Sequence, residues 1–521
     1  GMLPRRTLAG FAAPLLLTAL VASACSSSQE AGSAPTTTAP RSECAPKSGE
    51  KAAKALLRCS ESSIAFVENQ DATGTGVVID RDGNRYVLTN SHVVDPFDSA
   101  DISVGGERFD AVPVIGIDAG ADIAVVGPLE GDDLPSALPI DQDAAVERGD
   151  DVYLVGFPGE VSNDDPEDLE VTIARGIISR TREVKAFEQR YFQTDASIAG
   201  GQSGGPLFDE RGHLIGISGL SFAENEFALA LSGEDVDDAV SKILDGNGDD
   251  YLAVPRTDED NELAKDGTFV LADASTYRQL FIPASKKQRT LEFTVDHADV
   301  VAVDMTTNVS DSPLAMSRST PLIAAELQKL VAAERGGTPD DLPDPNAMGI
   351  DEKAMKPETS PGVFSVEIPA DEDVYIGVQG PLLTEPLTVS FTSSLGVVDL
   401  SGDRPEGTIE IGDVIERVIP TYEDAADYEL TLEAGDEVEI RAESPQSDVA
   451  LVIFEPGVAL TPVVNVDLEG SEGVELVDDS DEGLYGLDAV TTISAKEGGT
   501  YRIRLFSNDA VTVLARLSVT E

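Results

Sequence analysis

The chain has 521 residues, a length that suggests three or four domains. Its 36 basic and 96 acidic residues give a formal net charge of -60. This charge argues against nucleic-acid binding, which needs clustered Lys and Arg, and against electrostatic docking to anionic lipid. We expect a well-solvated surface, and attraction of basic substrates or cations is the alternative.

Residues 1–25 have the pattern of an export signal. Two arginines precede an apolar stretch from Leu8 to Ala22, and small residues follow it up to Cys25. The length of the stretch argues against a permanent transmembrane anchor. Either Cys25 is the lipidated first residue of a bacterial lipoprotein, or cleavage follows Ala24 at an ordinary signal-peptidase site. Lipidation is preferred, although a lipobox normally has a larger aliphatic residue where Ala22 stands.

Residues 26–43 are rich in Ser, Thr, Pro and Ala, and they predict a disordered tether. The chain has three cysteines, so lipidation of Cys25 would leave Cys44 and Cys59 as a pair. A disulfide between them suits an exported protein and would tie the start of the next domain to a helical segment at residues 50–58. No cysteine cluster indicates zinc, and no metal or other cofactor is expected.

Three further segments carry the residue types of nucleophilic catalysis. LTNSHVV contains His92, ADIAVV contains Asp122, and GQSGGP contains Ser203. A serine hydroxyl needs a base to take its proton, and imidazole has a suitable pKa at neutral pH. A buried carboxylate can orient that imidazole. Of the other histidines, His213 lies in a hairpin-turn sequence and His297 lies far from the serine, so His92 is the candidate base.

Two aspartates compete for the role of orienting carboxylate. Asp118 lies four residues before Asp122 and could be the third member. An apolar run follows Asp122, which favours a place for it at the start of a buried strand, where its carboxylate would be shielded. Asp195 is interpreted as structural.

Residues 63–232 resemble a trypsin-like serine protease domain of the HtrA/Deg type. The chain order His, Asp, Ser is that of trypsin-type hydrolases. Other segments that carry the resemblance are GTGVVID (74–80), VGFPG (155–159), GIIS (176–179), TDA (194–196), LIGIS (214–218) and FALA (227–230). The resemblance implies a chymotrypsin-like fold of two packed six-stranded β-barrels and a serine endopeptidase that works through an acyl-enzyme.

The resemblance also implies the surroundings of the serine. The backbone N–H groups of Gly201 and Ser203 would form the oxyanion hole. Gln202 stands where zymogen-type members have an aspartate that pairs with a newly cut N-terminus, so we expect no activation by N-terminal cleavage. The substrate pocket would be small or apolar, which favours cleavage after small or aliphatic residues. Its expected lining residues are Ser197, Ile198, Ser218, Gly219 and Ala228.

The protease domain is predicted to span residues 44–250. Turns are expected at Asp82-Gly83, Gly105-Gly106 and Arg211-Gly212, and a C-terminal helix at residues 232–244 with Ser232 as its N-cap. Residues 245–250 resemble the start of a calcium loop. The later positions do not fit an EF-hand, so an acidic turn between domains is preferred. No carboxylate-binding motif of a PDZ domain follows.

The remainder of the chain shows a weak internal repeat of alternating, strand-like segments. It predicts two β-sandwiches at residues 251–396 and 397–521, the first with a helical insertion near residues 322–335. They resemble, in pattern only, the pre-peptidase C-terminal domains of secreted bacterial proteases. The fold class is therefore mainly β, with a double β-barrel followed by two β-sandwiches.

Together these features predict an exported serine endopeptidase of the bacterial cell envelope, either lipid-anchored on the outer side of the membrane or secreted. Its partners would be protein or peptide substrates, with envelope proteins or glycans as possible ligands of the sandwiches. The alternative is an envelope binding or adhesion protein in which the sandwiches carry the function and the protease fold is quiescent or self-processing.

Overall fold

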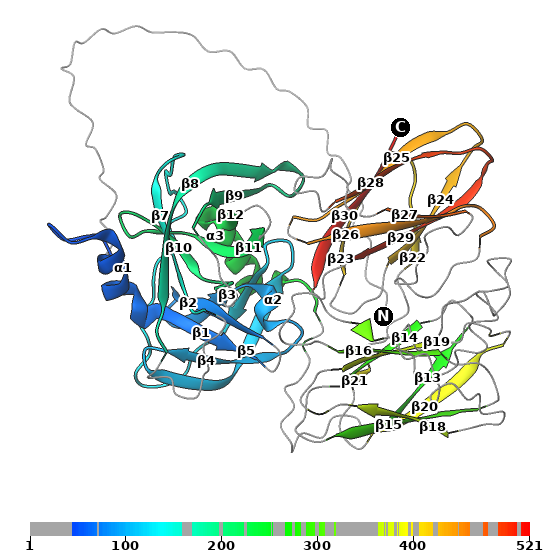
Figure 1. Ribbon diagram of the computed structural model, residues 1–521, viewed down its shortest axis with the longest axis horizontal. Helices are drawn as coiled ribbons and strands as arrows, with labels where there is room; N and C mark the ends of the chain where they lie inside the picture. Colours follow the sequence, from blue (N-terminus) through cyan, green and yellow to red (C-terminus); the bar gives the residue numbers. More distant parts are fainter. Residues whose placement is uncertain are drawn as a thin grey trace, which may run out of the picture. The chain divides into compact units, whose positions relative to one another are not determined.

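The computed structural model describes residues 44–521 with internal gaps (Figure 1). The longest gaps are 159–168, 254–265, 308–316, 319–362, 459–472 and 478–487, and the shorter ones include 197–201 and 223–226. The predicted export signal with Cys25, the predicted tether and the predicted helix near residues 322–335 lie outside the described residues. Within the described part, no helix is long and apolar enough to cross a membrane.

The first half of the described chain begins with a helix and a closed β-barrel. Helix α1 (Ala52–Ser60) carries Cys59, which forms a disulfide with Cys44 at a Cα–Cα distance of 5.3 Å. The barrel has the strand order β1-β2-β3-β6-β5-β4. Its strands are β1 (Ile64–Glu68), β2 (Thr73–Arg81), β3 (Asn84–Thr89), β4 (Ser99–Val104), β5 (Glu107–Asp118) and β6 (Ile123–Val126).

Two hairpins of this barrel turn where the sequence predicts. Asp82 and Gly83 have φ of 55° and 84°, and Gly105 and Gly106 have φ of 63° and 84°. Positive φ at both central residues is the geometry of a two-residue hairpin turn that matches the right-handed twist of the strands. Gly and Asp tolerate it better than most residues do.

A second closed barrel follows, with the order β10-β11-β12-β9-β8-β7. Its strands are β7 (Asp151–Gly156), β8 (Thr172–Val184), β9 (Gln189–Thr194), β10 (Pro206–Asp209), β11 (Leu214–Phe222) and β12 (Phe227–Ser232). Two closed six-stranded antiparallel barrels confirm the predicted chymotrypsin-like fold (Figure 1).

Helix α3 (Gly233–Lys242) follows the last strand of the second barrel, and a short turn of helix, η5 (Ile243–Asn247), extends it. The hydroxyl of Ser232 accepts a hydrogen bond from the N–H of Asp235, which confirms the predicted N-cap. Val236 and Val240 lie one turn apart and are fully buried, so the helix packs through the apolar face that its sequence spacing indicates.

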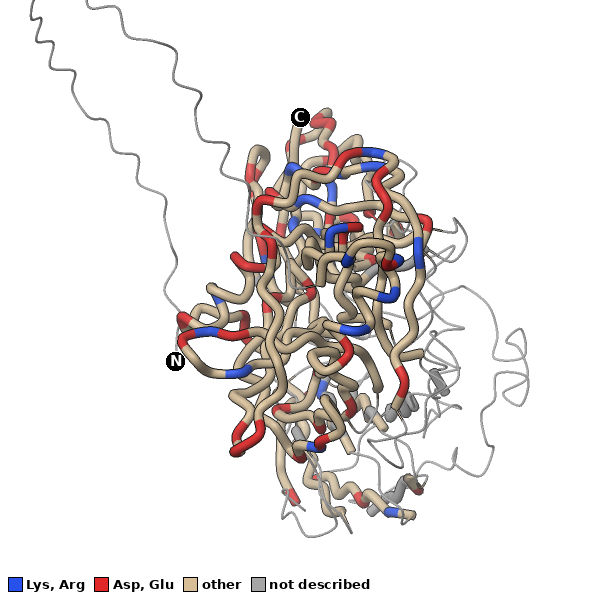
Figure 2. Tube along the Cα trace, turned by 90° about the vertical axis from the view of Figure 1, so that its left-hand side faces the viewer, with Lys and Arg blue, Asp and Glu red and all other residues tan. Residues whose placement is uncertain are grey.

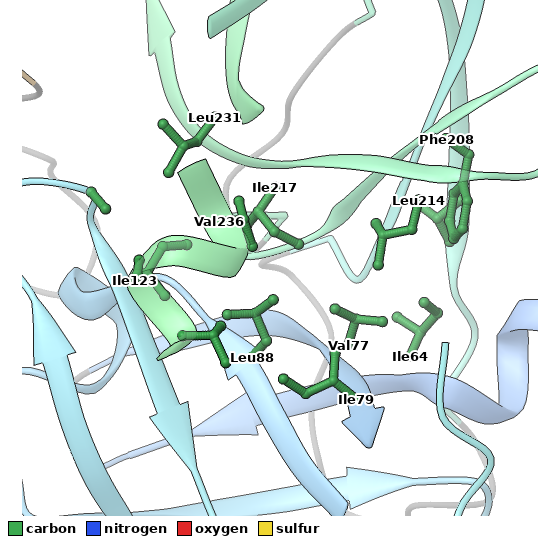
Figure 3. Packing of buried hydrophobic residues seen from close by; sticks show 14 of the residues in the cluster. Ile64, Val77, Ile79, Leu88, Ile123, Phe208, Leu214, Ile217, Leu231 and Val236 are labelled. Atoms are coloured by element: carbon green, nitrogen blue, oxygen red, sulfur yellow. The ribbon is translucent and has the colours of Figure 1, made fainter. Parts of the chain in front are cut away.

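The barrels share a hydrophobic core because successive strand residues point to opposite faces. Ile64 and Phe66 of β1 belong to a large cluster that includes residues of both barrels, whereas Ala65 and Val67 belong to a smaller cluster of the first barrel alone. The labelled members of the large cluster in Figure 3 are Ile64, Val77, Ile79, Leu88, Ile123, Phe208, Leu214, Ile217, Leu231 and Val236. The strands that carry the site are therefore fixed to one another by a common core.

Four sheets follow in the C-terminal half. The sheets β13-β20-β15-β18 and β17-β16-β19-β14-β21 share one buried core, and β22-β24-β29-β26-β27 and β23-β30-β25-β28 share another. A common core between two sheets is the packing of a β-sandwich. The first pair consists of β13 (Asp266–Leu271), β14 (Tyr277–Ile282), β15 (Arg289–Val295), β16 (Ala302–Thr307), β17 (Ser317–Arg318), β18 (Val363–Ile368), β19 (Val374–Gln379), β20 (Leu387–Ser393) and β21 (Val398–Asp399).

The second pair repeats the strand order of the first. The order β13-β20-β15-β18 recurs as β23-β30-β25-β28, and β14-β19-β16-β17 recurs as β24-β29-β26-β27. The repeat seen weakly in the sequence is thus a repeat of topology, while the domain boundaries and the likeness to pre-peptidase C-terminal domains stay predictions. The strands are β22 (Glu406–Thr408), β23 (Val414–Ile419), β24 (Ala426–Leu432), β25 (Glu437–Glu443), β26 (Val449–Phe454), β27 (Val474–Val477), β28 (Ala489–Ser494), β29 (Gly499–Ser507) and β30 (Val513–Thr520).

Charge is spread along the chain. Asp and Glu residues occur throughout the described trace and are not confined to one element (Figure 2). This distribution agrees with a net charge of -60 and with a well-solvated surface.

Candidate active site

His92 lies on a short helix, α2 (Ser91–Val94), directly after β3. Its Nδ1 is 2.7 Å from Oδ2 of Asp122, and the two side chains are 31% and 11% exposed. An ionised carboxylate can only accept a hydrogen bond, so this contact places the proton on Nδ1 of a neutral imidazole. The other ring nitrogen, Nε2, is then the one with a lone pair available for proton transfer.

Asp122 immediately precedes the buried strand β6 and is held from several directions. Its Oδ1 accepts hydrogen bonds from the hydroxyl of Ser91 at 2.8 Å and from the backbone N–H of His92 at 3.1 Å. Its carbonyl oxygen accepts from the side-chain amide of Asn90 at 2.8 Å. The backbone φ of Asp122 is 51°, in the left-handed region that aspartate adopts more readily than most residues other than glycine.

Ser203 stands in a turn that is bonded to both barrels. The carbonyl oxygen of Ser203 accepts a hydrogen bond from the N–H of Thr75 in β2 at 2.8 Å. The N–H of Gly204 donates to the carbonyl of Ser218 in β11 at 3.0 Å, and the N–H of Gly205 donates to the carbonyl of Gln202 at 2.9 Å. The turn is therefore fixed by the backbone hydrogen bonds of its neighbours.

The glycines around Ser203 bring this turn against the segment that carries His92. A Cβ atom on Gly204, whose φ is +83°, would lie 2.1 Å from the carbonyl oxygen of Thr75 and 3.1 Å from the backbone nitrogen of Asn90. A Cβ on Gly74 would lie 2.6 Å from a methyl of Val93 and 3.2 Å from the carbonyl oxygen of Ser203. Only glycine permits these approaches, and they place Ser203 beside residues 90–93.

Gln202 anchors the same turn to the second barrel. It is 4% exposed, and its side-chain amide donates to the hydroxyl of Thr172 at 2.7 Å. That hydroxyl donates to the carbonyl of Gly156 at 3.0 Å. The hydroxyl of Ser218 donates to the carbonyl of Gln202 at 3.0 Å. A neutral residue at this position thus bridges two strands, β7 and β8, through ordinary hydrogen bonds.

The predicted pocket is only partly described. Gly201, Ser197 and Ile198 lie outside the described residues. The other three expected lining residues are present, and they differ in what they face. Ala228 is 2% exposed in β12, and Ser218 is 1% exposed, with its hydroxyl turned to the nucleophile turn. A Cβ on Gly219 would lie 3.2 Å from Oδ2 of Asp122, so this glycine lies directly against the aspartate carboxylate.

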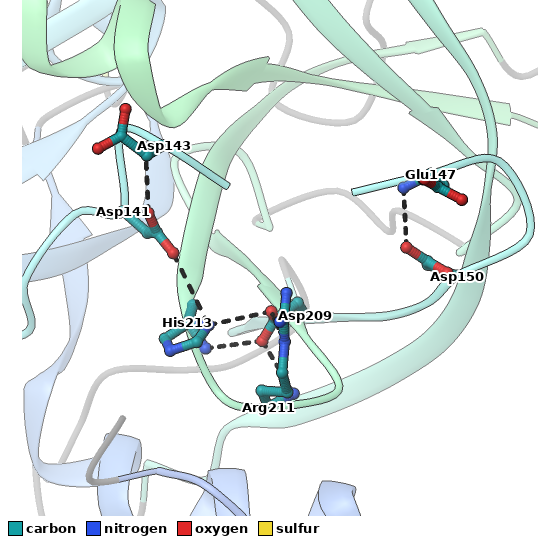
Figure 4. A network of polar contacts seen from close by, with 7 residues as sticks. All are labelled: Asp141, Asp143, Glu147, Asp150, Asp209, Arg211 and His213. Carbon is teal, nitrogen blue, oxygen red and sulfur yellow. Dashed lines mark hydrogen bonds and ion pairs between the residues drawn. The ribbon is translucent and has the colours of Figure 1, made fainter. Parts of the chain in front are cut away.

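His213 makes a different contact, at the hairpin between β10 and β11 (Figure 4). Its Nδ1 is 3.1 Å from Oδ2 of Asp209 and 3.7 Å from Oδ2 of Asp141. Asp209 also accepts hydrogen bonds from the backbone of Arg211 and of His213, both at 2.9 Å. This histidine therefore belongs to a hairpin turn, as its sequence context indicates, and its partners are not those of His92.

Asp118, the competing candidate, and Asp195, the aspartate interpreted as structural, make other contacts. Oδ2 of Asp118 is 3.0 Å from Nζ of Lys242, and Oδ1 of Asp195 accepts from the N–H of Ile177 at 2.8 Å. Asp122 is the one in contact with His92, which leaves Asp118 and Asp195 in supporting contacts.

Sequence reasoning did not single out the residues that fix Asp122 and Ser203 in place. These are Asn90, Ser91, Thr75 and Thr172. Asn90 and Ser91 directly precede His92, so their position in LTNSHVV was the available signal. Thr75 in the first barrel and Thr172 in the second lie far from Ser203 in the sequence, so no local pattern predicts their contacts with the nucleophile turn. Among the described residues, no group of three or more His, Cys, Asp or Glu side chains could hold a metal ion.

This region is similar to known proteins. Residues 74–217 match the family model of the trypsin-like peptidase domain. The serine endoprotease DegS of Salmonella typhimurium is 35% identical over 152 residues, which cover 29% of this chain and 40% of that protein. The serine protease Do-like HtrB of Bacillus subtilis is 28% identical over 210 residues, which cover 36% of this chain and 44% of that protein.

A probable periplasmic DegP-like serine endoprotease of a Marinomonas species is 29% identical over 204 residues, covering 38% of this chain and 41% of that protein. Among solved structures, a serine endoprotease from Yersinia pestis is 28% identical and covers 36% of this chain and 65% of that one, with a TM-score of 0.31. The chain spans less than half the length of these curated relatives. It contains a trypsin-like peptidase domain that is similar to serine endoproteases of the HtrA/Deg type.

Proposed function

We propose that the protein is an exported serine endopeptidase of the HtrA/Deg type with a triad of Ser203, His92 and Asp122. The observation that carries the proposal is the 2.7 Å contact between Nδ1 of His92 and Oδ2 of Asp122. It lies beside the nucleophile turn, inside the region that matches the trypsin-like peptidase family. The named relatives are serine endoproteases, which supports the same reaction here.

Each residue of the triad has a defined role in the proposed mechanism. Ser203 Oγ attacks the carbonyl carbon of the peptide bond while Nε2 of His92 takes its proton. Asp122 keeps the proton of His92 on Nδ1 and stabilises the imidazolium that forms. His92 then gives its proton to the leaving amine, and an acyl-enzyme remains on Ser203. Water, deprotonated by the same imidazole, releases the acid product.

The negative charge that develops on the carbonyl oxygen needs hydrogen-bond donors. We assign this task to the backbone N–H groups of Ser203 and Gly201, which a glycine-rich turn can direct at one point. Gln202 supports the arrangement because it is held by Thr172. A turn anchored in this way does not depend on an ion pair to a new N-terminus, so cleavage-dependent activation is not part of the proposal.

The substrates would be proteins or peptides with a small or aliphatic residue before the scissile bond. Ser218, Gly219 and Ala228 themselves carry no charge that could pair with a Lys or Arg of the substrate, which supports this preference. The signal-like residues 1–25 support export, and Cys25 is proposed as a lipid attachment site. The C-terminal sheets would hold substrate, an envelope partner or glycan.

Intact-mass labelling with a fluorophosphonate tests the proposal, with wild type beside Ser203→Ala. A single adduct on the wild type that is absent from Ser203→Ala would establish an activated serine, and profiling with a peptide library would then define the residue before the cleaved bond. A folded wild type that forms no adduct would overturn the proposed activity and favour a binding or adhesion protein.

A further inference from the structure

The segment by which the chain leaves the second barrel returns to the first. After α3 and η5, the backbone N–H of Asp249 donates to the carbonyl of Ile117 at 2.8 Å, and the two residues form an isolated β-bridge. Gly248 makes a close approach at the same point, since a Cβ there would lie 3.1 Å from the carbonyl oxygen of Ile117. Residues 242–251, here called the exit clasp, thus pair with the end of β5. This end lies directly before the loop that carries Asp122.

Lys242 joins two carboxylates within this clasp. Its Nζ is 3.0 Å from Oδ2 of Asp118 and 3.0 Å from Oδ1 of Asp249. Burial by itself would lower the pKa of the Lys242 ammonium, but the two carboxylates outweigh it and the pKa is raised. The lysine therefore stays charged at neutral pH and can hold both carboxylates in place.

Each carboxylate holds in turn the backbone of the loop before Asp122. Oδ2 of Asp249 accepts a hydrogen bond from the N–H of Ala119 at 2.9 Å, and Oδ1 of Asp118 accepts from the N–H of Ala121 at 3.0 Å. Ala121 is the residue directly before Asp122. The positive φ of Asp122 is thus preceded by a turn that Lys242 and its two partners fix.

The same segment contacts the chain that follows His92. The hydroxyl of Tyr251 donates to the carbonyl of Phe97 at 3.3 Å, and Tyr251 packs against the apolar cluster of the first barrel. Phe97 is bonded back to α2 through its N–H, which donates to the carbonyl of Val94 at 2.9 Å. The exit clasp therefore contacts the loops on both sides of the pair formed by His92 and Asp122.

We propose that the exit clasp positions Asp122 for catalysis, with Lys242, Asp118 and Asp249 as positioning residues. This inference rests on the proposed function. It gives Asp118 a defined role, four residues before the aspartate that contacts His92. If the cluster served only to fasten α3 to the first barrel, its loss would lower stability and leave the bond between His92 and Asp122 unchanged.

The test uses the full chain and compares Lys242→Met with Lys242→Arg and with a matched control, Arg175→Met. Arg175 forms a 2.6 Å ion pair with Asp151 between β8 and β7 of the second barrel, whereas Asp122 precedes β6 of the first. Two quantities are measured: the second-order rate constant of fluorophosphonate labelling, and the low-field proton resonance of the bond between His92 and Asp122, identified by its loss in His92→Gln.

Lys242→Met is expected to lower the labelling rate constant by about ten- to hundredfold, since small displacements of catalytic groups reduce rates by such factors. The low-field resonance should shift or broaden in the same variant. Lys242→Arg, which keeps the charge, should recover most of the rate, and Arg175→Met should match the wild type in both measurements. Thermal denaturation shows that each variant is folded at the temperature used.

The outcomes separate the two proposals. If the wild type is labelled and folded Lys242→Met is labelled at the same rate with an unchanged resonance, the clasp proposal is overturned and the proposed function stands. If the wild type is not labelled, the proposed function fails. Whether the exit clasp positions Asp122 is then decided by the low-field resonance alone, compared between the wild type and Lys242→Met. Should Lys242→Met not fold, the double variant Lys242→Met/Asp249→Asn, which buries one charge fewer, replaces it in both measurements.

Discussion

Two histidines in this protein rest on an aspartate through Nδ1, and their surroundings differ. His92 contacts Asp122 at 2.7 Å across 30 residues of sequence, and His213 contacts Asp209 at 3.1 Å across four. The carboxylate of Asp209 accepts hydrogen bonds from backbone N–H groups of its own hairpin. Asp122 instead accepts hydrogen bonds from the three consecutive residues 90–92, the last of which is His92. The side chains of His92 and His213 are 31% and 19% exposed.

The difference shows that contact between an imidazole and a carboxylate is not sufficient to indicate a triad. The hairpin pair stabilises a turn of β10 and β11, with Gly212 close to the backbone of Cys44. The other pair lies beside Gly204, in the turn that carries a serine. What distinguishes the candidate site is the third segment, which the fold brings from the second barrel to residues 90–93 of the first.

Exchange of each histidine gives the largest expected contrast. His92→Ala should lower kcat for peptide hydrolysis by a factor on the order of one million, because the variant loses the base that takes the serine proton in the proposed mechanism. His213→Ala should leave kcat within about twofold of the wild type, since its loss affects only a hairpin. Steady-state hydrolysis of a peptide with a small residue before the cleaved bond measures both. Comparable losses in the two variants would remove the distinction.

Substitution of the two partner aspartates, Asp122 and Asp209, should give the same contrast in kcat, with a smaller difference. Asp122→Asn is expected to lower kcat by about ten-thousandfold, because an amide at this position favours the wrong tautomer of His92. Asp209→Asn should keep the rate and lower the free energy of unfolding by about 1–3 kcal/mol, because buried N–H groups lose a charged acceptor. Rate assays and urea denaturation of both variants measure these effects. An Asp122→Asn variant with wild-type activity would exclude Asp122 from the triad.

The glycine turns provide a comparison of stability. Gly204→Ala should cost about 3–5 kcal/mol, because the added Cβ meets backbone and side-chain atoms at 2.1–2.4 Å and φ is positive. Gly83→Ala, at φ +84° with nothing within 4 Å of the added Cβ, should cost only about 1–2 kcal/mol. Urea denaturation of the two variants measures the difference. Equal costs would mean that the nucleophile turn is not held against the first barrel.

Much of this arrangement could be predicted from the sequence, because its signals are local. The alternating strands, the Asp82-Gly83 turn and the Ser232 N-cap follow from short-range chemistry. His92 and Ser203 stand in motifs that resemble a family, and the apolar run after Asp122 indicates its buried strand. These features depend on residues that lie within a few positions of one another.

The supporting contacts could not be predicted because they join residues far apart in the chain. Lys242 lies more than one hundred residues after Asp118, and no pattern in the sequence links the two residues, although Asp118 itself was a candidate carboxylate. The bond from Thr75 to the carbonyl of Ser203 joins two barrels. These contacts form only once each barrel has closed, and no periodic pattern of residues in the sequence predicts them.

Alkaline pH should give the smallest effect and should act on the exit clasp. The pKa of Lys242 is raised from 10.5, where burial opposes and the carboxylates of Asp118 and Asp249 prevail. The pKa of Tyr251 is raised from 10.0 by burial first and then by Asp95 and Asp98. A raised pKa in the folded state means that the contribution to stability is complete below the unfolded pKa and is lost as pH rises through the folded pKa.

The window for this loss therefore opens near pH 10 and extends upward, and the clasp should be unaffected between pH 7 and pH 9. Urea midpoints measured from pH 8 to pH 11.5 should fall more steeply for the wild type than for Lys242→Met/Tyr251→Phe, which has neither group to titrate. Other buried tyrosines lower both curves alike, so the difference between the curves isolates the clasp. Parallel curves would mean that Lys242 and Tyr251 keep the same protonation equilibria in the folded and unfolded chain, and the ionic contacts would then be too weak to position Asp122.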